Sequence, residues 1–239
     1  MDLGLRGVVA LVVGGSGLIG EAVGRALVAE GATVVLASRS ADRLAEVAAS
    51  IDPAVGVVTI DTLSTESVEA AVAQVVAEHG SIEVLVNTAA PSARTLDPER
   101  NSDPKQVTKA FEAKAMGYLR CCNAVLPHMV AAGFGRVINV SGQNAYLTGS
   151  ITGSVRNAAV IIASKALADS VAGTGVTVNV VNPGVVTPEP AVEVTAGAPG
   201  ESSPEQVAAV VTFLASRVSS AVSGESISVG HRVRGVSAF

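Results

Sequence analysis

A cluster of glycines near the start of the chain has the spacing of a phosphate-binding turn. Gly14, Gly17 and Gly20 stand between a Val-rich run, which predicts a buried strand, and a segment with apolar residues at helical spacing. Such a turn lets backbone N–H groups approach a pyrophosphate, and the helix start adds partial positive charge. The commoner dinucleotide-binding spacing is Gly-x-Gly-x-x-Gly, so a tight turn in any α/β protein is the alternative. The flanking strand and helix favour a dinucleotide site, formed by Gly14, Ser16, Gly17, Leu18, Ile19 and Gly20.

The end of the second predicted strand indicates which dinucleotide binds. Residues 33–37 predict that strand, and Ser38 and Arg39 follow it. A carboxylate here would bind the ribose hydroxyls and repel a 2′-phosphate, whereas Arg39 can pair with that phosphate and Ser38 can hydrogen-bond it. We therefore expect NADP(H) as the cofactor, with a solvated loop arginine as the alternative. Asp61 and Thr62, after the third predicted strand, could reach the adenine amino group.

Strand-like and helix-like segments alternate along the whole chain. This alternation predicts an α/β fold: a doubly wound parallel sheet of about seven strands flanked by helices, in a single domain that spans residues 1–239. The segment 185–203 is rich in Pro, Gly, Ala and Thr, which suits a flexible lid over a bound substrate. We expect strands at 8–13, 33–37, 55–60, 82–86, 136–140, 176–181 and 227–229, and helices at 21–30, 42–50 (with Asp42 as N-cap), 65–79, 107–132, 153–173 and 204–216.

Composition excludes several classes of partner. The chain has 239 residues, is 49% hydrophobic and only 15% charged, and carries a formal net charge of -5, so it offers no basic field for nucleic acid. No apolar run approaches the ~20 residues that span a bilayer, and the first residues lack the layout of a signal peptide. Cys121 and Cys122 are adjacent, a poor arrangement for a structural disulfide. We therefore expect a reduced, cytoplasmic protein without nucleic-acid or membrane partners.

Six landmarks, in a fixed order, resemble the short-chain dehydrogenase/reductase family over essentially the whole chain. Their order and spacing together carry the resemblance, which implies a Rossmann fold with a nicotinamide cofactor lying across the strand ends. The resemblance adds Asn87, Ala89, Lys165, Pro183, Gly184 and Val186 to the cofactor-binding residues. The landmarks are the glycine turn, Asp61 and the segments 87–90 (NTAA), 139–141 (NVS), 163–166 (ASKA) and 183–187 (PGVVT).

The resemblance also implies a catalytic set, and here the chain departs from the family. The family uses a Tyr-x-x-x-Lys pair, one helical turn apart, in which the Tyr exchanges a proton with the substrate and the Lys holds the cofactor ribose. A Ser orients the carbonyl, and an Asn on the preceding long helix holds a water. Lys165 matches the Lys, but Ile161 stands where the Tyr is expected and Lys114 where the Asn is. The Ser position is Ser141 or Gly142, and the distance from Ser141 to Ile161 is several residues longer than usual.

Another group must supply the proton that Ile161 cannot. Lys114 is a donor near the expected site, and burial could lower its pKa enough for acid–base work; a salt bridge or a solvated helix face is the alternative. Tyr118 and Tyr146 are phenols for which we favour a packing role, and Asn157 lies one turn before Ile161. We assign the catalytic role to Ser141, Lys165 and Lys114, and no residue to a metal.

Two functions of different classes fit these observations. The first is an NADP(H)-dependent oxidoreductase that acts on a small or apolar carbonyl- or imine-type substrate with a non-standard proton donor. The second is an NADP(H)-binding protein of the same fold without redox turnover: a sensor, a partner subunit or a lyase. The resemblance further implies a homodimer or homotetramer, joined through the long helix from Val107 and the helix that carries Lys165.

Overall fold

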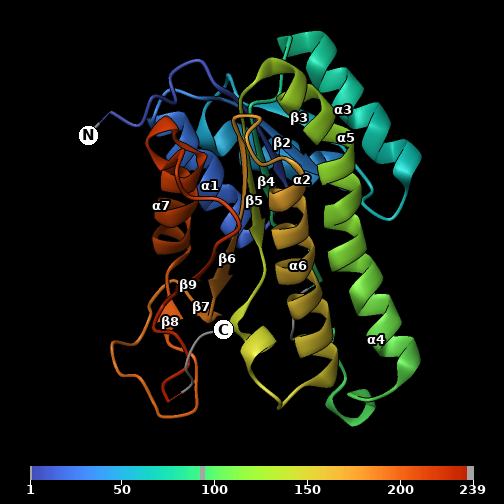
Figure 1. The fold of residues 1–239 in the computed structure, drawn as a ribbon, viewed down its shortest axis with the longest axis vertical. Helices are drawn as coiled ribbons and strands as arrows, with labels where there is room; N and C mark the ends of the chain where they lie inside the picture. Colours follow the sequence, from blue (N-terminus) through green and yellow to red (C-terminus); the bar gives the residue numbers. More distant parts are fainter. Residues whose placement is uncertain (1, 92–94, 236–239) are drawn as a thin grey trace.

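A seven-stranded parallel sheet forms the centre of the computed structural model, which describes residues 2–91 and 95–235 (Figure 1). The strand order is β3-β2-β1-β4-β5-β6-β9, so the chain winds outward in both directions from the boundary between β1 and β4. Ligands of such sheets bind outside the carboxyl ends of the strands at this reversal. The strands are β1 (Val9–Val13), β2 (Thr33–Ser38), β3 (Gly56–Thr59), β4 (Val84–Asn87), β5 (Gly135–Val140), β6 (Val176–Pro183) and β9 (Ser226–Val229).

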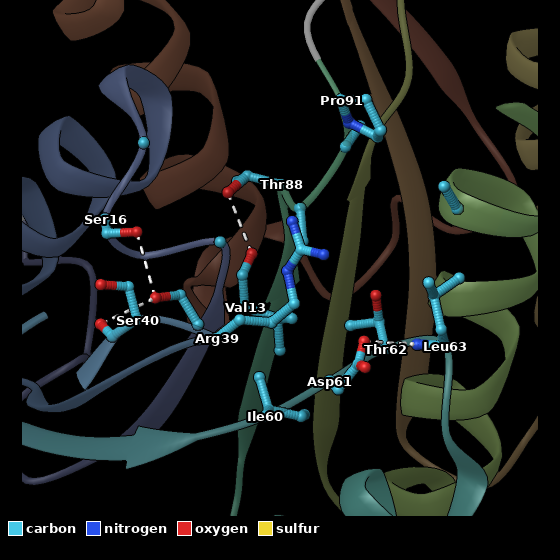
Figure 2. A pocket seen from close by; sticks show the side chains of 16 residues that line it. Val13, Ser16, Arg39, Ser40, Ile60, Asp61, Thr62, Leu63, Thr88 and Pro91 are labelled. Carbon is cyan, nitrogen blue, oxygen red and sulfur yellow. Dashed lines mark hydrogen bonds between the residues drawn. The ribbon is translucent and has the colours of Figure 1, made fainter. Parts of the chain in front are cut away.

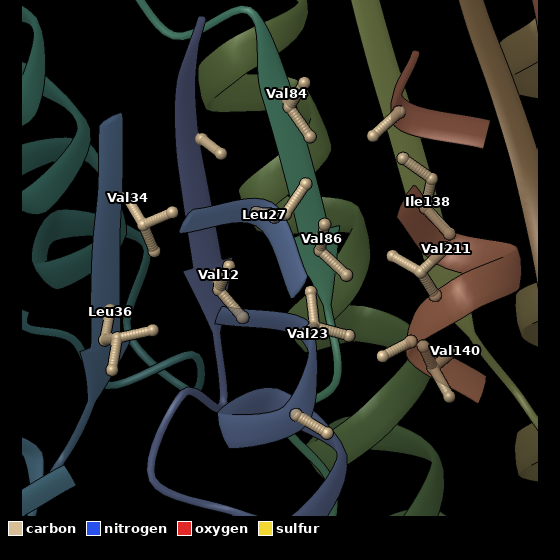
Figure 3. Close-up of a cluster of buried hydrophobic side chains, with 14 of the residues drawn as sticks. Val12, Val23, Leu27, Val34, Leu36, Val84, Val86, Ile138, Val140 and Val211 are labelled. Atoms are coloured by element: carbon tan, nitrogen blue, oxygen red, sulfur yellow. The ribbon is translucent and has the colours of Figure 1, made fainter. Parts of the chain in front are cut away.

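Helices cover both faces of the sheet. On one face α1 (Leu18–Ala29), α2 (Ala41–Ile51) and α7 (Pro204–Ala215) pack against alternate strand residues such as Val12. Figure 3 shows side chains of α1 and α7 against the strands of this face. On the other face, α3 (Thr65–His79), α5 (Gly117–Ala132) and α6 (Ile151–Ser170) pack against the intervening residues, such as Leu11. Because strand side chains alternate between faces, strands buried on both sides are apolar throughout, as the Val-rich runs predicted.

The doubly wound α/β fold predicted from the sequence is confirmed, and most boundaries fall within a few residues of the expected ones. Two predictions of local structure were wrong. Helix α2 begins earlier than expected, because the Ser40 side chain, and not Asp42, accepts a hydrogen bond from the backbone N–H of Arg43. The predicted helix 107–132 begins earlier, with α4 (Pro104–Phe111), and reaches α5 through a π turn at Glu112–Met116.

The segment expected to form a lid, 185–203, returns on itself at the carboxyl edge of the sheet. Strands β7 (Val185–Val186) and β8 (Glu201–Ser202) form a short parallel pair at its two ends, and Val192 between them is 98% exposed. Its role as a lid stays a prediction. Within the ranges that the structure describes, no helix has the length and hydropathy needed to cross a membrane.

Candidate active site

The glycine turn closes tightly onto its neighbours at the carboxyl end of β1. Gly14 has φ of +88°, and a Cβ there would lie 2.5 Å from the backbone nitrogen of Ala89. A Cβ on Gly20 would lie 2.3 Å from the Gly14 carbonyl oxygen, so α1 can pack against the turn only without a side chain at this position. Both glycines are therefore required by the close approach of backbone to backbone.

Helix α1 begins at this turn without a side-chain cap. Its N-cap is Gly17, which has no side chain to accept from the first-turn N–H groups. In contrast, Ser40, Ser64, Ser150 and Ser203 cap α2, α3, α6 and α7 with their hydroxyl groups. The first N–H groups of a helix have no acceptor within it, so those of α1 remain available to an anion.

A cleft of about 350 Å³ lies at the carboxyl ends of β1, β2, β3 and β4, where the sheet reverses its order (Figure 2). Eight of the predicted cofactor residues line it: Gly14, Ser16, Gly17, Ser38, Arg39, Asp61, Thr62 and Ala89. Sequence reasoning did not assign the other lining residues, although each is next in the chain to an assigned or lining residue: Val13, Ser40, Ile60, Leu63, Thr88, Ala90, Pro91 and Ala113.

The side of the cleft formed by β2 has donors suited to a phosphate. The Ser16 hydroxyl donates a hydrogen bond of 3.1 Å to the Ser38 hydroxyl, so the glycine turn and the end of β2 meet there. Arg39 is exposed at the edge of the cleft and forms none of the ion pairs found in the described residues. These residues, with the uncapped start of α1, fit an NADP-type dinucleotide.

The remaining predicted cofactor residues do not line this cleft. Asn87 is fully buried, and its side-chain amide donates to Asn139 Oδ1 at 2.8 Å, so its side chain ties β4 to β5. Leu18, Ile19 and Gly20 form the first turn of α1, adjacent to the cleft. Pro183, Gly184 and Val186 lie at the carboxyl end of β6 and in β7. Their contact with a cofactor stays a prediction.

A second polar group lies at the carboxyl end of β5, where the π turn faces α6. Lys114, in the π turn, donates hydrogen bonds of 2.8 Å to the Ser141 carbonyl oxygen and of 2.8 Å to Asn157 Oδ1. The Ser141 hydroxyl donates to the Asn157 carbonyl oxygen at 2.9 Å, so its proton is already engaged. A Cβ on Gly142, the alternative serine position, would lie 3.4 Å from Asn157 Nδ2. The structure thus brings Lys114 and Ser141 together, with Asn157 between them.

Burial tunes the amine of Lys114 toward neutral pH. Desolvation is the main cause, and the positive charge of Arg156 adds to it; together they lower the pKa of Lys114 to about 7. The side chain is only 5% exposed, and its two hydrogen bonds go to uncharged acceptors. In the neutral amine both N–H groups can serve these acceptors, which leaves the nitrogen lone pair free to take a proton. Salt bridging and a solvated helix face, the alternatives for Lys114, do not describe it.

The prediction that Lys165 lies in the site is wrong. Its ammonium contacts Asp169 at 2.5 Å on the surface of α6, and its side chain is 55% exposed. A Cβ on Gly224 would lie 3.0 Å from Lys165 Cδ, which places the lysine beside the loop before β9, at the amino end of that strand. Since α6 runs antiparallel to the strands, Lys165 lies toward the opposite edge of the sheet from Ser141.

The residues of α6 that lie beside Ser141 are about two helical turns closer to the N-terminus than Lys165, which was predicted to lie there. Asn157 occupies the position that faces Ser141, and Gly153, one turn before it, is buried. Asn157 therefore lies beside Ser141, whereas Ile161 and Lys165 lie one and two turns further along α6. Both phenols already have hydrogen-bond partners, because Tyr118 donates to the Val140 carbonyl oxygen and the Tyr146 hydroxyl contacts the Ser226 hydroxyl.

A parallel sheet whose reversal point opens beside a glycine turn defines a dinucleotide-binding α/β protein. A family model described as short chain dehydrogenase matches residues 8–198. The chain belongs to the short chain dehydrogenase family.

Relatives match over nearly the full chain. The (2S)-((R)-hydroxy(phenyl)methyl)succinyl-CoA dehydrogenase subunit BbsC of Thauera aromatica is 36% identical over 238 aligned positions, which cover 94% of this chain and 93% of its own. The 3-oxoacyl-(acyl-carrier-protein) reductase FabG of Vibrio harveyi is 30% identical, over 95% of this chain and 97% of its own. A solved structure of YwfH, described as an NADPH dependent reductase involved in bacilysin biosynthesis, superposes with a TM-score of 0.78 at 26% identity, covering 94% and 99% of the two chains. These relatives are oxidoreductases of the same fold.

Proposed function

We propose that the protein is an NADP(H)-dependent oxidoreductase that reduces a small or apolar carbonyl- or imine-type substrate, with Lys114 as the proton donor. The buried Lys114 amine carries this proposal: it lies at the carboxyl end of β5, and its pKa is lowered to about 7. A general acid is most effective when its pKa is near the working pH. The nicotinamide, when bound, supplies the hydride.

The cleft residues support the cofactor part of the proposal. The uncapped first turn of α1 offers N–H groups to a pyrophosphate, and Arg39 with Ser38 offers a charged and an uncharged donor to a 2′-phosphate. No carboxylate lines the cleft on the β2 side that would repel that phosphate. Among the relatives, YwfH is described as NADPH dependent.

Lys114 can complete a reduction without a tyrosine. Its ammonium form carries one N–H beyond the two that Ser141 and Asn157 accept. Transfer of that proton to the substrate oxygen, as the carbonyl carbon gains a hydride, yields an alcohol and a neutral amine. Asn157 and the Ser141 carbonyl oxygen hold the nitrogen in both protonation states, so the proton can move without loss of position.

The experiment follows loss of the NADPH absorbance band with a panel of ketones, quinones and imines. Lys114→Met should lower turnover by a factor on the order of 10²–10⁴, the usual contribution of general acid–base catalysis. Lys109→Met is the matched control, because Lys109 is exposed on α4. Turnover by the wild type that Lys114→Met leaves unchanged would contradict the role of Lys114. Tight NADPH binding without turnover on any substrate would favour the next candidate.

The second candidate is a subunit that binds cofactor but relies on a partner for turnover. One specific observation supports it: the relative from Thauera aromatica is named as a subunit of a dehydrogenase. The discriminating measurement is turnover by the purified chain alone. Turnover by the purified wild-type chain without a partner, together with its loss in Lys114→Met, excludes this candidate.

We also propose that the chain forms a homodimer or homotetramer through α5 and α6. A groove between these helices contains several apolar side chains, and Val130 in it is 39% exposed. Such a surface is poorly suited to face water. Light scattering of the purified chain at micromolar concentration should report a dimer or tetramer, and a monomer would refute the proposal. The groove is lined by Asn123, Leu126, Pro127, Val130, Ala131, Leu167, Ser170 and Val171.

A further inference from the structure

Arg156 is a buried cation without a counter-ion in the described residues. It lies on α6 next to Asn157 and is 4% exposed. Its Nη1 donates to the Pro91 carbonyl oxygen at 3.0 Å, whereas its Nε is buried and has no hydrogen-bond partner. None of the ion pairs in residues 2–91 and 95–235 includes it.

This arrangement is costly for the free protein. A guanidinium remains charged inside a protein, and buried charges are normally paired with a carboxylate. Desolvation lowers the pKa of Arg156, because burial disfavours the charged form of the guanidinium. The Arg156 charge lowers the pKa of the nearby Lys114 amine. When protonated, this amine is a second cation in the same region. An anion that entered here would relieve an existing penalty rather than create a new one.

The free edge of the guanidinium has the geometry of a carboxylate receptor. Nη1 is engaged by Pro91, and among the described residues neither Nε nor Nη2 has a hydrogen-bond partner. These two nitrogens form one edge of the planar fork, and such an edge binds both oxygens of a carboxylate through parallel hydrogen bonds.

The position of Arg156 connects this edge to the site of chemistry. Pro91, its partner, lines the cleft just after β4. Asn157, its neighbour in the chain, holds the Lys114 amine. The Arg156 charge also acts on the Lys114 amine, so a ligand bound to Arg156 would lie near both the residue that follows β4 and the proton donor.

We propose that Arg156 binds a carboxylate group of the substrate, so that the substrate is a short oxo acid. This inference rests on the proposed function for its carbonyl chemistry, but the binding step does not require turnover. The anion pairs with the Nε–Nη2 edge, and the carbonyl of the same molecule faces Lys114. A substrate without an anionic group would leave the guanidinium unpaired.

The test compares two probes of matched shape, acetoacetate and its neutral methyl ester, by calorimetric titration of the full chain. A charge-assisted hydrogen bond predicts that the acid binds about tenfold or more tightly than the ester. Arg156→Gln should bring the two affinities within about twofold, since the amide lacks the charge. Arg120→Gln is the control, because this arginine pairs with Glu112 in the π turn and should keep the preference.

Each outcome decides the proposal. Equal affinity of the wild type for the acid and the ester overturns it, as does a preference for the acid that persists in Arg156→Gln. If Arg156→Gln does not fold, Arg156→Lys replaces it: a lysine keeps the charge but not the fork, so an undiminished preference would overturn the proposal and a reduced one would support it. Binding of acetoacetate without its reduction would leave Arg156 as an anion receptor and count against the proposed function alone.

Discussion

Arg39→Ala tests the cofactor assignment directly, because the structure isolates this side chain. Arg39 is exposed at the end of β2 and pairs with no carboxylate in the described residues, so its removal should leave the free protein unchanged in stability. Any loss of NADPH affinity therefore reports the interaction with the 2′-phosphate.

The magnitude follows from the exposure of the arginine. A hydrogen bond to a charged group contributes about 1.5–3 kcal/mol, which corresponds to a factor of about 10–150 in affinity. Because Arg39 lies at the open edge of the cleft, solvent and salt screen the pair, and we expect the lower part of that range, about 10- to 30-fold. NADH lacks the 2′-phosphate, so its affinity should change by less than about twofold.

The assay is titration of NADPH and NADH by cofactor fluorescence, at about 0.15 M and about 1 M salt, where the screening length falls from about 8 to about 3 Å. The loss should shrink at the higher salt. Arg43→Ala is the matched control, because Arg43 is also exposed but lies outside the cleft and contacts Glu46 only at 3.8 Å. Equal affinity of the wild type for the two cofactors, or equal losses in both variants, would refute the reasoning.

Three further predictions follow from the fold and the site. Burial lowers the pKa of Lys114 to about 7, so the unfolded chain binds more protons between pH 7 and about 10; the stability of the wild type relative to Lys114→Met should therefore rise with pH in this window, as urea titrations would show. Lys165→Ala should leave NADPH affinity unchanged, because Lys165 pairs with Asp169 on the surface. A higher Kd for NADPH in this variant would contradict that placement. Gly20→Ala should lower both the melting temperature and NADPH affinity, since its Cβ would lie 2.3 Å from the Gly14 carbonyl oxygen, and unchanged melting would contradict the packing argument.

Much of the fold could be predicted because its elements are encoded locally. Val-rich runs buried on both faces, caps such as Ser64 and the positive-φ Gly80 that ends α3 each act over a few residues. The cofactor cleft was predictable for the same reason, since the glycine turn and the ends of β2 and β3 carry their own residue patterns. Ser40 was missed as a cap because Asp42, two residues later, has the same capping chemistry.

The catalytic part could not be predicted equally well, because it depends on which residues of α6 lie beside Ser141 at the end of β5. The segment 163–166 imitates the family pattern, but it follows the true facing residue, Asn157, by two helical turns, about 12 Å of helix. The unusually long separation from Ser141 to Ile161 was the sign that the register was wrong. The partnership of Lys114 with Asn157 joins two helices through tertiary packing, and Arg156 gave no pattern in the sequence at all.

The π turn at Glu112–Met116 has a consequence for how sites of this kind arise. A π turn holds one more residue than an α turn, so one inserted residue creates it and one deleted residue removes it. With α5 fixed against the sheet, deletion of Ala115 would rotate the residues before it, Lys114 and α4 included, by about 100° and shift them by about 1.5 Å, which would carry the Lys114 amine away from the Ser141 carbonyl. A change of a single codon could thus install or withdraw the amine in one evolutionary step. Helix length between β4 and β5 should therefore separate lineages that carry a buried amine from those that do not.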